Sequence, residues 1–195
     1  MVDSKIWCTE MTPRDAYFQS WNQECRIQEL EAIIATNAYY SYLYANEIIK
    51  GRWEPGEAII VTDSEYSYLY AKDIIKGRWE PVEAIIVTDS EYSYLYARYV
   101  IKGRWEPVEA IIATNAYYSY LYANEIIKGR WEPVEAIIAT DAYYSCCYAR
   151  YVIKGRFPLG EPVIAQPGYW KYYLNDISMT EEDKTFLILR YGPPK

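Results

Sequence analysis

The chain has 195 residues, 51% hydrophobic and 24% charged, so its composition is that of a folded protein and excludes a disordered one. The net charge of −7 argues against a surface that binds phosphate backbones without sequence preference. Histidine is absent, which removes the commonest general base and zinc ligand. We therefore expect no catalytic residue, no metal site and no cofactor.

Residues 1–30 do not follow the pattern of the rest of the chain and are predicted to form a divergent N-terminal cap. The run Thr12-Pro13-Arg14-Asp15 indicates the start of a helix, because proline suits a first helical turn. An atypical first unit is typical of stacked arrays, since its outer face meets water instead of a neighbour.

Residues 31–160 hold five copies of a 26-residue segment without an insertion or deletion. Such copies predict one structural unit stacked on itself, in which each unit buries its apolar side against its neighbours. The predicted fold class is therefore all-α: an α-solenoid of tandem 26-residue helix-turn-helix repeats with divergent N- and C-terminal caps. The constant spacing is marked by Trp53, Trp79, Trp105, Trp131 and Phe157.

Each copy is predicted to contain a longer helix, which covers residues 64–76 in the second copy. Asp63 or Ser64 is expected to cap its start, and Gly77 to end it in the left-handed conformation. A strand is the alternative for the sequence EYSYLY, which alternates and is rich in β-formers. The helix is favoured because the stretch continues without a turn signal into AKDIIKG.

A helical wheel places the small residues Ser67 and Ala71 on one face, where a neighbouring backbone can approach closely, and Asp73 on the far side. A shorter helix is predicted over residues 81–87, with Pro81 as its first residue. The connections on both sides of it are short, which predicts that successive helices run roughly antiparallel.

Residues 161–195 are predicted to form a degenerate sixth repeat and the C-terminal cap. Residues 169–174 repeat the tyrosine-rich character of the longer helices. Residues 179–183 indicate the capped start of one more helix.

The run Tyr70-Ala71-Lys72-Asp73-Ile74-Ile75-Lys76-Gly77-Arg78-Trp79 resembles a known kind of sequence. It is similar to the short tandem repeats of the form Y-A-x-x-V-I-K-G-R-W/F-P-E-A-E in uncharacterised bacterial and bacteriophage proteins. The resemblance covers about residues 31–161 and departs where four copies insert Glu between Trp and Pro. It implies a helical repeat and a bacterial or phage origin, without an assigned activity.

One pair of positions varies strongly between the copies, and a second variable triplet lies at residues 37–39, 63–65, 89–91, 115–117 and 141–143. Positions that accept both an acid and a tyrosine do not belong to a shared core, so we predict that they are exposed and form a ladder along one surface. Such ladders often form the recognition surface of repeat arrays, and Arg and Tyr are common in binding hot spots. Neutral drift on a solvated face is the alternative. The rungs are Asn46-Glu47, Lys72-Asp73, Arg98-Tyr99, Asn124-Glu125 and Arg150-Tyr151.

The motif Lys-Gly-Arg-Trp recurs after the longer helices. Cations beside a flat aromatic ring suggest a second hypothesis, the binding of single-stranded nucleic acid along this edge. The structural interpretation is favoured, in which the cations complement the helix dipole and the indole fills the gap between units. Each unit is also nearly neutral or acidic, so nucleic acid is not the expected partner. The cations of this edge are Lys50, Arg52, Lys76, Arg78, Lys102, Arg104, Lys128 and Arg130.

The cysteines Cys8, Cys25, Cys146 and Cys147 lack the spacing of a zinc or redox site. Cys146 and Cys147 stand where the other copies carry Tyr and Leu, which indicates drifted packing residues. No signal peptide or apolar run of membrane-spanning length is visible. We expect a cytoplasmic protein without membrane attachment, in the host cytoplasm if a phage encodes it.

The sequence thus predicts a non-enzymatic scaffold that binds another protein of unknown identity. A structural protein that associates with itself is the third hypothesis.

Overall fold

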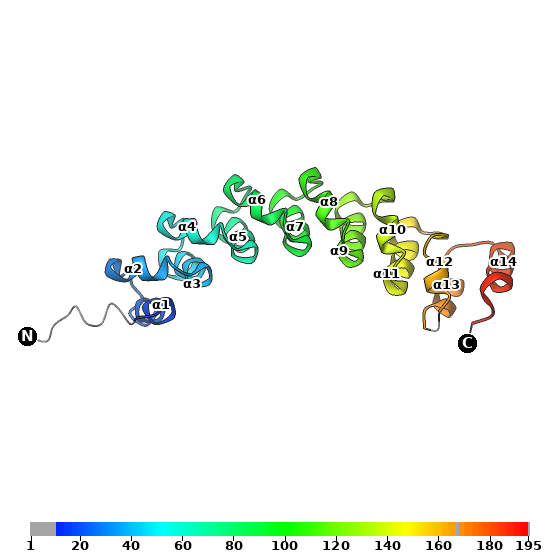
Figure 1. The fold of residues 1–195 in the computed structure, drawn as a ribbon, viewed down its shortest axis with the longest axis horizontal. Coiled ribbons are helices and arrows are strands. Elements are labelled where there is room, and N and C mark those ends of the chain that lie inside the picture. The colour runs from blue at the N-terminus through cyan, green and yellow to red at the C-terminus, as the bar shows by residue number, and fades with distance from the viewer. Residues whose placement is uncertain (1–10, 167, 195) are drawn as a thin grey trace, which may run out of the picture. The chain divides into compact units, whose positions relative to one another are not determined.

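The computed structural model describes residues 11–166 and 168–194. Every regular element in this part of the chain is a helix, which confirms the predicted all-α class. The chain divides into two compact units, Met1–Ile101 and Lys102–Lys195. Within each unit, pairs of helices repeat along the chain (Figure 1).

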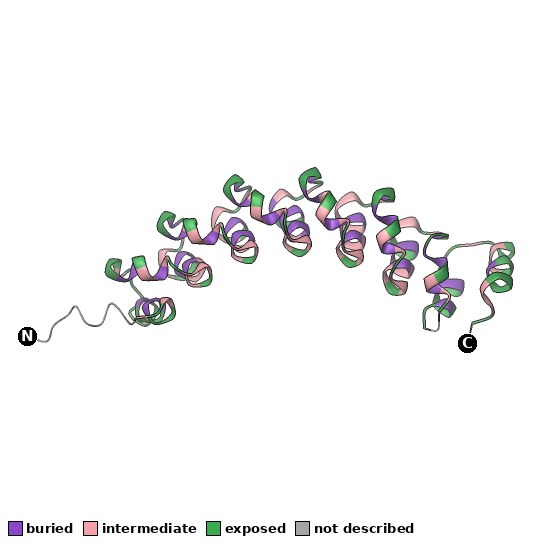
Figure 2. Ribbon diagram, viewed as in Figure 1, coloured by how far each residue is buried: buried purple, intermediate pink, exposed green. Residues whose placement is uncertain are grey.

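The first unit alternates shorter helices with longer, tyrosine-rich ones. Consecutive longer helices pack side by side, and each also packs on a shorter helix, so the buried residues lie between two layers (Figure 2). The first helix is α1 (Pro13–Asn22), and the shorter ones are α2 (Gln28–Ile34), α4 (Glu54–Ile60) and α6 (Glu83–Ile86) with its 3₁₀ turn η4 (Glu80–Val82). The longer ones begin as α3 (Ala38–Leu43), α5 (Ser64–Tyr70) and α7 (Ser90–Tyr96).

The second unit repeats this arrangement. Its shorter helices are α8 (Glu109–Ile112), α10 (Glu135–Ile138) and α12 (Glu161–Ile164), the first two entered through the 3₁₀ turns η6 (Glu106–Val108) and η8 (Glu132–Val134). Its longer helices begin as α9 (Ala116–Leu121) and α11 (Ala142–Cys147), and α13 (Trp170–Asp176) takes the place of a third. The last helix is α14 (Glu181–Tyr191).

The second half of each longer helix is π-helical, which the sequence analysis did not predict. These segments are η2 (Tyr44–Ile49), η3 (Ala71–Ile75), η5 (Ala97–Ile101), η7 (Tyr122–Ile127) and η9 (Tyr148–Ile153). A π-helix bonds each N–H to the carbonyl five residues earlier, so the positions that follow its start are rotated relative to an α-helix.

The helix starts follow the predicted capping. The side chain of Asp63 accepts a hydrogen bond from the backbone N–H of Tyr66 at 3.1 Å, and Asn37 does the same in the first copy. Thr12 caps α1, and Thr180 caps α14 through a capping box with Asp183. The shorter helix of the second copy begins one residue before Pro81, which is therefore its second residue and not its first.

The helix ends correct the prediction about glycine. The left-handed residue is Lys76, with a φ of 58°, and not Gly77. The carbonyl of Ala71 accepts hydrogen bonds from the N–H groups of both Lys76 and Gly77, which closes the π-helical segment. The other copies end in the same way, with φ between 56° and 60° at Lys50, Lys102, Lys128 and Lys154.

Close packing of the longer helices rests on small residues, as predicted. Ser67 and Ala71 are fully buried, and the Ser67 hydroxyl donates to the carbonyl of Ile60 at 2.8 Å. The tryptophan of each motif is also buried, with Trp79 only 5% exposed. The indole rings therefore belong to the buried core, which favours the structural interpretation of the motif.

A buried tyrosine fastens each longer helix to the preceding turn. The Tyr70 hydroxyl accepts a hydrogen bond from the backbone N–H of Trp53 at 2.7 Å and donates to Glu57 Oε1 at 3.0 Å. Arg52 holds the same carboxylate through two of its nitrogens. This polar cluster is repeated in the second unit, where the Tyr148 hydroxyl joins the Trp131 N–H and Glu135.

The cluster is already present in the segment predicted as the N-terminal cap. The Arg26 guanidinium bonds to Glu31, as Arg52 does to Glu57, and Tyr44 donates to Glu31 at 3.1 Å. Burial acts to raise the pKa of Glu31, but the hydrogen bonds from Arg26 and Tyr44 outweigh it and lower the pKa. Trp7 and Cys8 lie outside the described residues.

Candidate partner-binding surface

All five rungs of the ladder lie in the π-helical segments. The rung Asn46-Glu47 lies in η2, and the rungs Lys72-Asp73 and Arg98-Tyr99 lie in η3 and η5 of the same unit. The second unit carries Asn124-Glu125 in η7 and Arg150-Tyr151 in η9. Because the π-helix is part of the repeated backbone, the rungs differ in side chains and not in the element that presents them.

Most of the ladder residues are exposed, but three are not fully so. Asp73, Asn124 and Glu125 are half-buried, which corrects the expectation that every rung would be solvated. Asp73 also does not lie on the far side of its helix, because the π-helical segment rotates it relative to the α-helical wheel. It faces the preceding repeat, where the Tyr42 hydroxyl donates to its Oδ2 at 3.0 Å.

The acidic rungs of the first unit are thus engaged by tyrosines of the preceding helix. The Tyr17 hydroxyl donates to Glu47 Oε2 at 2.6 Å, which parallels the bond from Tyr42 to Asp73. Burial, and then the hydrogen-bonded carboxylate, raise the pKa of both phenols. Glu47 and Asp73 therefore link consecutive repeats in addition to forming part of the surface.

The Arg–Tyr rungs present their rings outward. Tyr99 is 42% exposed and Tyr151 is 50% exposed. The Arg98 guanidinium lies 4.9 Å from the ring centroid of Tyr99, and that of Arg150 lies 5.3 Å from the ring centroid of Tyr151. Such a pairing holds the charge over the flat face of the ring.

Each arginine has a second contact that fixes its direction. Arg98 Nη1 donates to the Tyr94 hydroxyl at 2.6 Å, and Arg150 Nη1 lies 3.0 Å from Asp176 Oδ2. The remaining cationic rung residue, Lys72, lies 3.4 Å from Asp73 and 5.6 Å from the ring centroid of Tyr68. The ladder therefore carries oriented groups instead of freely rotating side chains.

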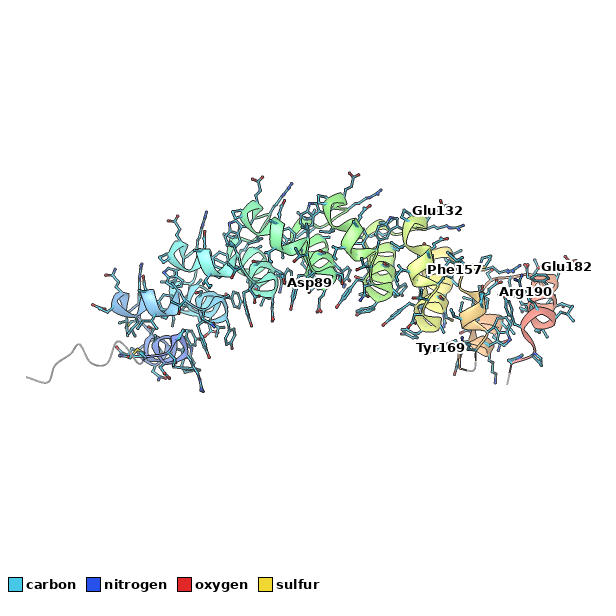
Figure 3. The ribbon with its side chains drawn as sticks, in the orientation of Figure 1. Asp89, Glu132, Phe157, Tyr169, Glu182 and Arg190 are labelled. Atoms are coloured by element: carbon cyan, nitrogen blue, oxygen red, sulfur yellow. The ribbon has the colours of Figure 1, made fainter. Side chains whose placement is uncertain are left out.

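A second row of tyrosines runs beside the ladder, at the start of the longer helices. Exposed rings pack against the next repeat, with centroid distances of 5.5 Å for Tyr39–Tyr66 and 5.3 Å for Tyr117–Tyr144. Tyr143, which is 50% exposed, continues the row of the second unit toward Tyr169 at 5.8 Å. In Figure 3 the Tyr169 label lies at the opposite edge of that unit from Glu132, which belongs to a short-helix turn.

Sequence reasoning missed one feature of this surface. A pocket of about 220 Å³ opens between α11, η9 and α13, and Cys146, Arg150, Tyr151 and Tyr169 are among the residues that line it. The sequence predicts only drifted packing residues at Cys146 and Cys147, whereas the structure places both in the lining of this pocket. The signal in the sequence was the size of the change, since a cysteine in place of a tyrosine removes a whole ring.

The Lys-Gly-Arg-Trp edge differs from a nucleic-acid groove in two respects. Each of its arginines is already paired through two nitrogens with a glutamate five residues later, as Arg78 is with Glu83. The pairs Arg52–Glu57, Arg104–Glu109 and Arg130–Glu135 have the same geometry. The indole rings beside them are buried, so no flat face is available for a base to stack on.

Within residues 11–166 and 168–194, no cluster of three or more acidic or cysteine side chains is arranged to hold a metal ion. In the same residues, no helix is both long enough and apolar enough to span a bilayer. In comparisons with family models, curated proteins and solved structures, no match to this chain was found.

Proposed function

We propose that the chain is a non-enzymatic repeat scaffold that binds another protein through the ladder. The observation that carries this proposal is the exposed Arg–Tyr rung, which occurs at Arg98-Tyr99 in one unit and Arg150-Tyr151 in the other. Arginine and tyrosine supply large contact area and directed hydrogen bonds, and they dominate the residues that contribute most to protein interfaces. The cysteine usage favours action in a reducing compartment such as the cytoplasm.

A contrast between the rungs supports selection for binding over neutral drift. The acids Glu47 and Asp73 accept hydrogen bonds from a preceding tyrosine, so their chemistry serves the stack. Tyr99 and Tyr151 leave about half of their rings in solvent, so a partner that covered them would gain hydrophobic free energy. Drift on a solvated face does not favour two large aromatic residues beside an arginine.

The chain supplies its own matched variant for the test. Replacing both Arg–Tyr rungs by the Asn–Glu sequence of the first rung, as Arg98→Asn, Tyr99→Glu, Arg150→Asn and Tyr151→Glu, uses residues that the same π-helical segment already carries. Affinity purification from the native host should recover a partner with the unchanged chain and lose it with this variant. Retention of the partner, with an unchanged circular dichroism spectrum, would exclude the ladder as the binding surface.

The control exchanges exposed residues on the other layer, for example Ala58→Ser and Ala84→Ser, and should leave the partner bound. A salt titration with single-stranded oligonucleotides tests the nucleic-acid hypothesis, because that hypothesis requires binding that weakens steeply as the salt concentration rises. Light scattering across a range of protein concentrations tests the self-association hypothesis, because self-association would make the apparent mass rise with concentration.

A further inference from the structure

One tyrosine of the inter-repeat packing is missing in the fifth copy. Cys146 stands where the preceding copies carry Tyr42, Tyr68, Tyr94 and Tyr120. For Tyr42 and Tyr120, the ring lies over a ring of the next repeat. The centroid distance is 6.2 Å for Tyr42 over Tyr66 and 6.3 Å for Tyr120 over Tyr144, and both pairs are stacked.

The buried tyrosine cluster shows which residues of α13 correspond to residues of the longer helices in the earlier copies. The Trp131 N–H reaches the Tyr148 hydroxyl 17 residues later, whereas the Phe157 N–H reaches the Tyr173 hydroxyl only 16 residues later. The sixth copy is therefore one residue shorter before Tyr173. With this correction, Tyr169 is the equivalent of Tyr144.

The same correction makes Asp176 the equivalent of Asp73 and of the second residue of each rung. The ring contact of Tyr143 with Tyr169 at 5.8 Å agrees, since it corresponds to that of Tyr117 with Tyr144 at 5.3 Å. The fifth copy is thus still followed by Tyr169, the ring on which the missing ring would stack. It is also followed by Asp176, the carboxylate that would accept a hydrogen bond from the missing hydroxyl. It lacks only the phenol.

The space left by the missing phenol is the pocket of about 220 Å³. It is larger than the cavity of about 150 Å³ that is known to bind benzene in another protein, so it has room for one aromatic ring. Tyr143, Tyr151, Tyr169 and Tyr172 supply aromatic walls. Arg150 lines one side and holds the Asp176 carboxylate at 3.0 Å, close to the place of the missing hydroxyl.

We propose that this pocket binds the side chain of a tyrosine from the partner protein, with its ring against Tyr169 and its hydroxyl donating to Asp176. The inference rests on the proposed function, and it names the residue type that the ladder selects. The bond from Tyr42 to Asp73 is the intramolecular model for the contact. A phenylalanine would fill the ring site without the hydrogen bond, and a phosphotyrosine would bring a dianion against the carboxylate.

The first experiment uses N-acetyl-tyrosinamide as the probe in a titration of the full chain followed by nuclear magnetic resonance. Shifts should be confined to residues around α11, η9 and α13, and N-acetyl-phenylalaninamide should bind at least about threefold more weakly. Cys146→Tyr restores the residue of the other copies and should fill the site, which weakens probe binding by at least about tenfold. Cys25→Ser, at an exposed cysteine of the other unit, is the control and should bind as the unchanged chain does.

The proposal is overturned if the probe shifts no resonance near Tyr169, or if Cys146→Tyr binds it as well as the unchanged chain. The partner purification separates the two proposals. A partner that is lost with the Asn–Glu rungs but kept with Cys146→Tyr removes the pocket and leaves the ladder. The reverse test changes only the rung of the first unit, as Arg98→Asn with Tyr99→Glu, because Arg150 and Tyr151 also line the pocket. A partner that is kept with this variant but lost with Cys146→Tyr removes the Arg98-Tyr99 rung from the binding surface and leaves the tyrosine site.

Discussion

Removing one hydroxyl, by Tyr70→Phe, tests whether the buried tyrosine cluster holds successive repeats together. The ring of Tyr70 is fully buried, so the variant keeps its packing and leaves no cavity. Two hydrogen bonds are lost: the one that the backbone N–H of Trp53 donates at 2.7 Å, and the one that the hydroxyl donates to Glu57 at 3.0 Å.

The two losses differ in size. The N–H of Trp53 is left buried without an acceptor, which costs about 1 to 3 kcal/mol. Glu57 keeps both bonds from Arg52, so losing its third donor adds about 1 kcal/mol. We expect Tyr70→Phe to lower the free energy of unfolding by about 2 to 4 kcal/mol.

Urea unfolding followed by tryptophan fluorescence measures this change. With a slope of about 2 kcal/mol per molar urea, the midpoint should fall by about 1 to 2 M while the slope stays constant. Tyr66→Phe is the matched control, because its ring packs against Tyr39 and Tyr42 while its hydroxyl has no hydrogen bond within the described part of the chain. A midpoint for Tyr70→Phe that equals that of Tyr66→Phe would refute the reasoning.

Three further predictions follow from the repeated backbone, and each is measured by the same unfolding assay unless stated. Lys76→Gly should stabilise the chain by up to about 1 kcal/mol, because φ is 58° at this residue and glycine carries no left-handed penalty; a loss of stability would contradict the assigned helix end. Gly51→Ala should be close to neutral, because its Cβ would meet nothing within 4 Å, and a loss of more than about 1 kcal/mol would contradict the open space at this turn. Burial raises the pKa of Tyr44 and Tyr148 from 10.0 to about 12, so the stability that their protonated forms provide is complete below pH 10 and is lost as the pH rises toward 12. The loss should reach about 1.4 kcal/mol per pH unit for each tyrosine, so circular dichroism should change together with tyrosinate absorbance, and ionisation at pH 10 without unfolding would contradict it.

The sequence predicted the elements whose signals are local. Asp63 and Asn37 cap helices in the way their side chains suggest, and Ser67 with Ala71 marks the face where helices approach closely. The stacked-repeat architecture was predicted from the repetition itself, because near-identical 26-residue segments are expected to fold alike and to contact their neighbours in the same way.

The helix end could not be predicted from residue preferences. Glycine is the usual left-handed residue after a helix, so Gly77 was the natural choice. The π-helical segment adds one residue to the hydrogen-bonded turn, and this brings Lys76 to the left-handed position instead. No residue type in AKDII signals a π-helix, so the sequence offered no local sign of this segment.

The candidate site was predicted in part for the same reason. The ladder positions were found because they vary between copies, but their exposure depended on the helix phase, which the π-helix changes after Ala71. Asp73 therefore turned out to face Tyr42 of the preceding repeat. The pocket needed the three-dimensional match of Tyr169 and Asp176, since one residue is missing between the fifth and sixth copies.

Near-identity of the copies makes each difference between them interpretable. The rungs Asn46-Glu47 and Arg98-Tyr99 occupy the same place in a π-helical segment, so exchanging them changes the chemistry of the surface while the backbone keeps its hydrogen bonds. The presence of Cys146 in place of a tyrosine has a different effect. It removes a phenol that packs between repeats in other copies, such as Tyr42 against Asp73, and a pocket lies at this position instead. A protein that repeats one scaffold can therefore change the chemistry of its surface, or open a pocket, by single substitutions that the neighbouring repeats already support.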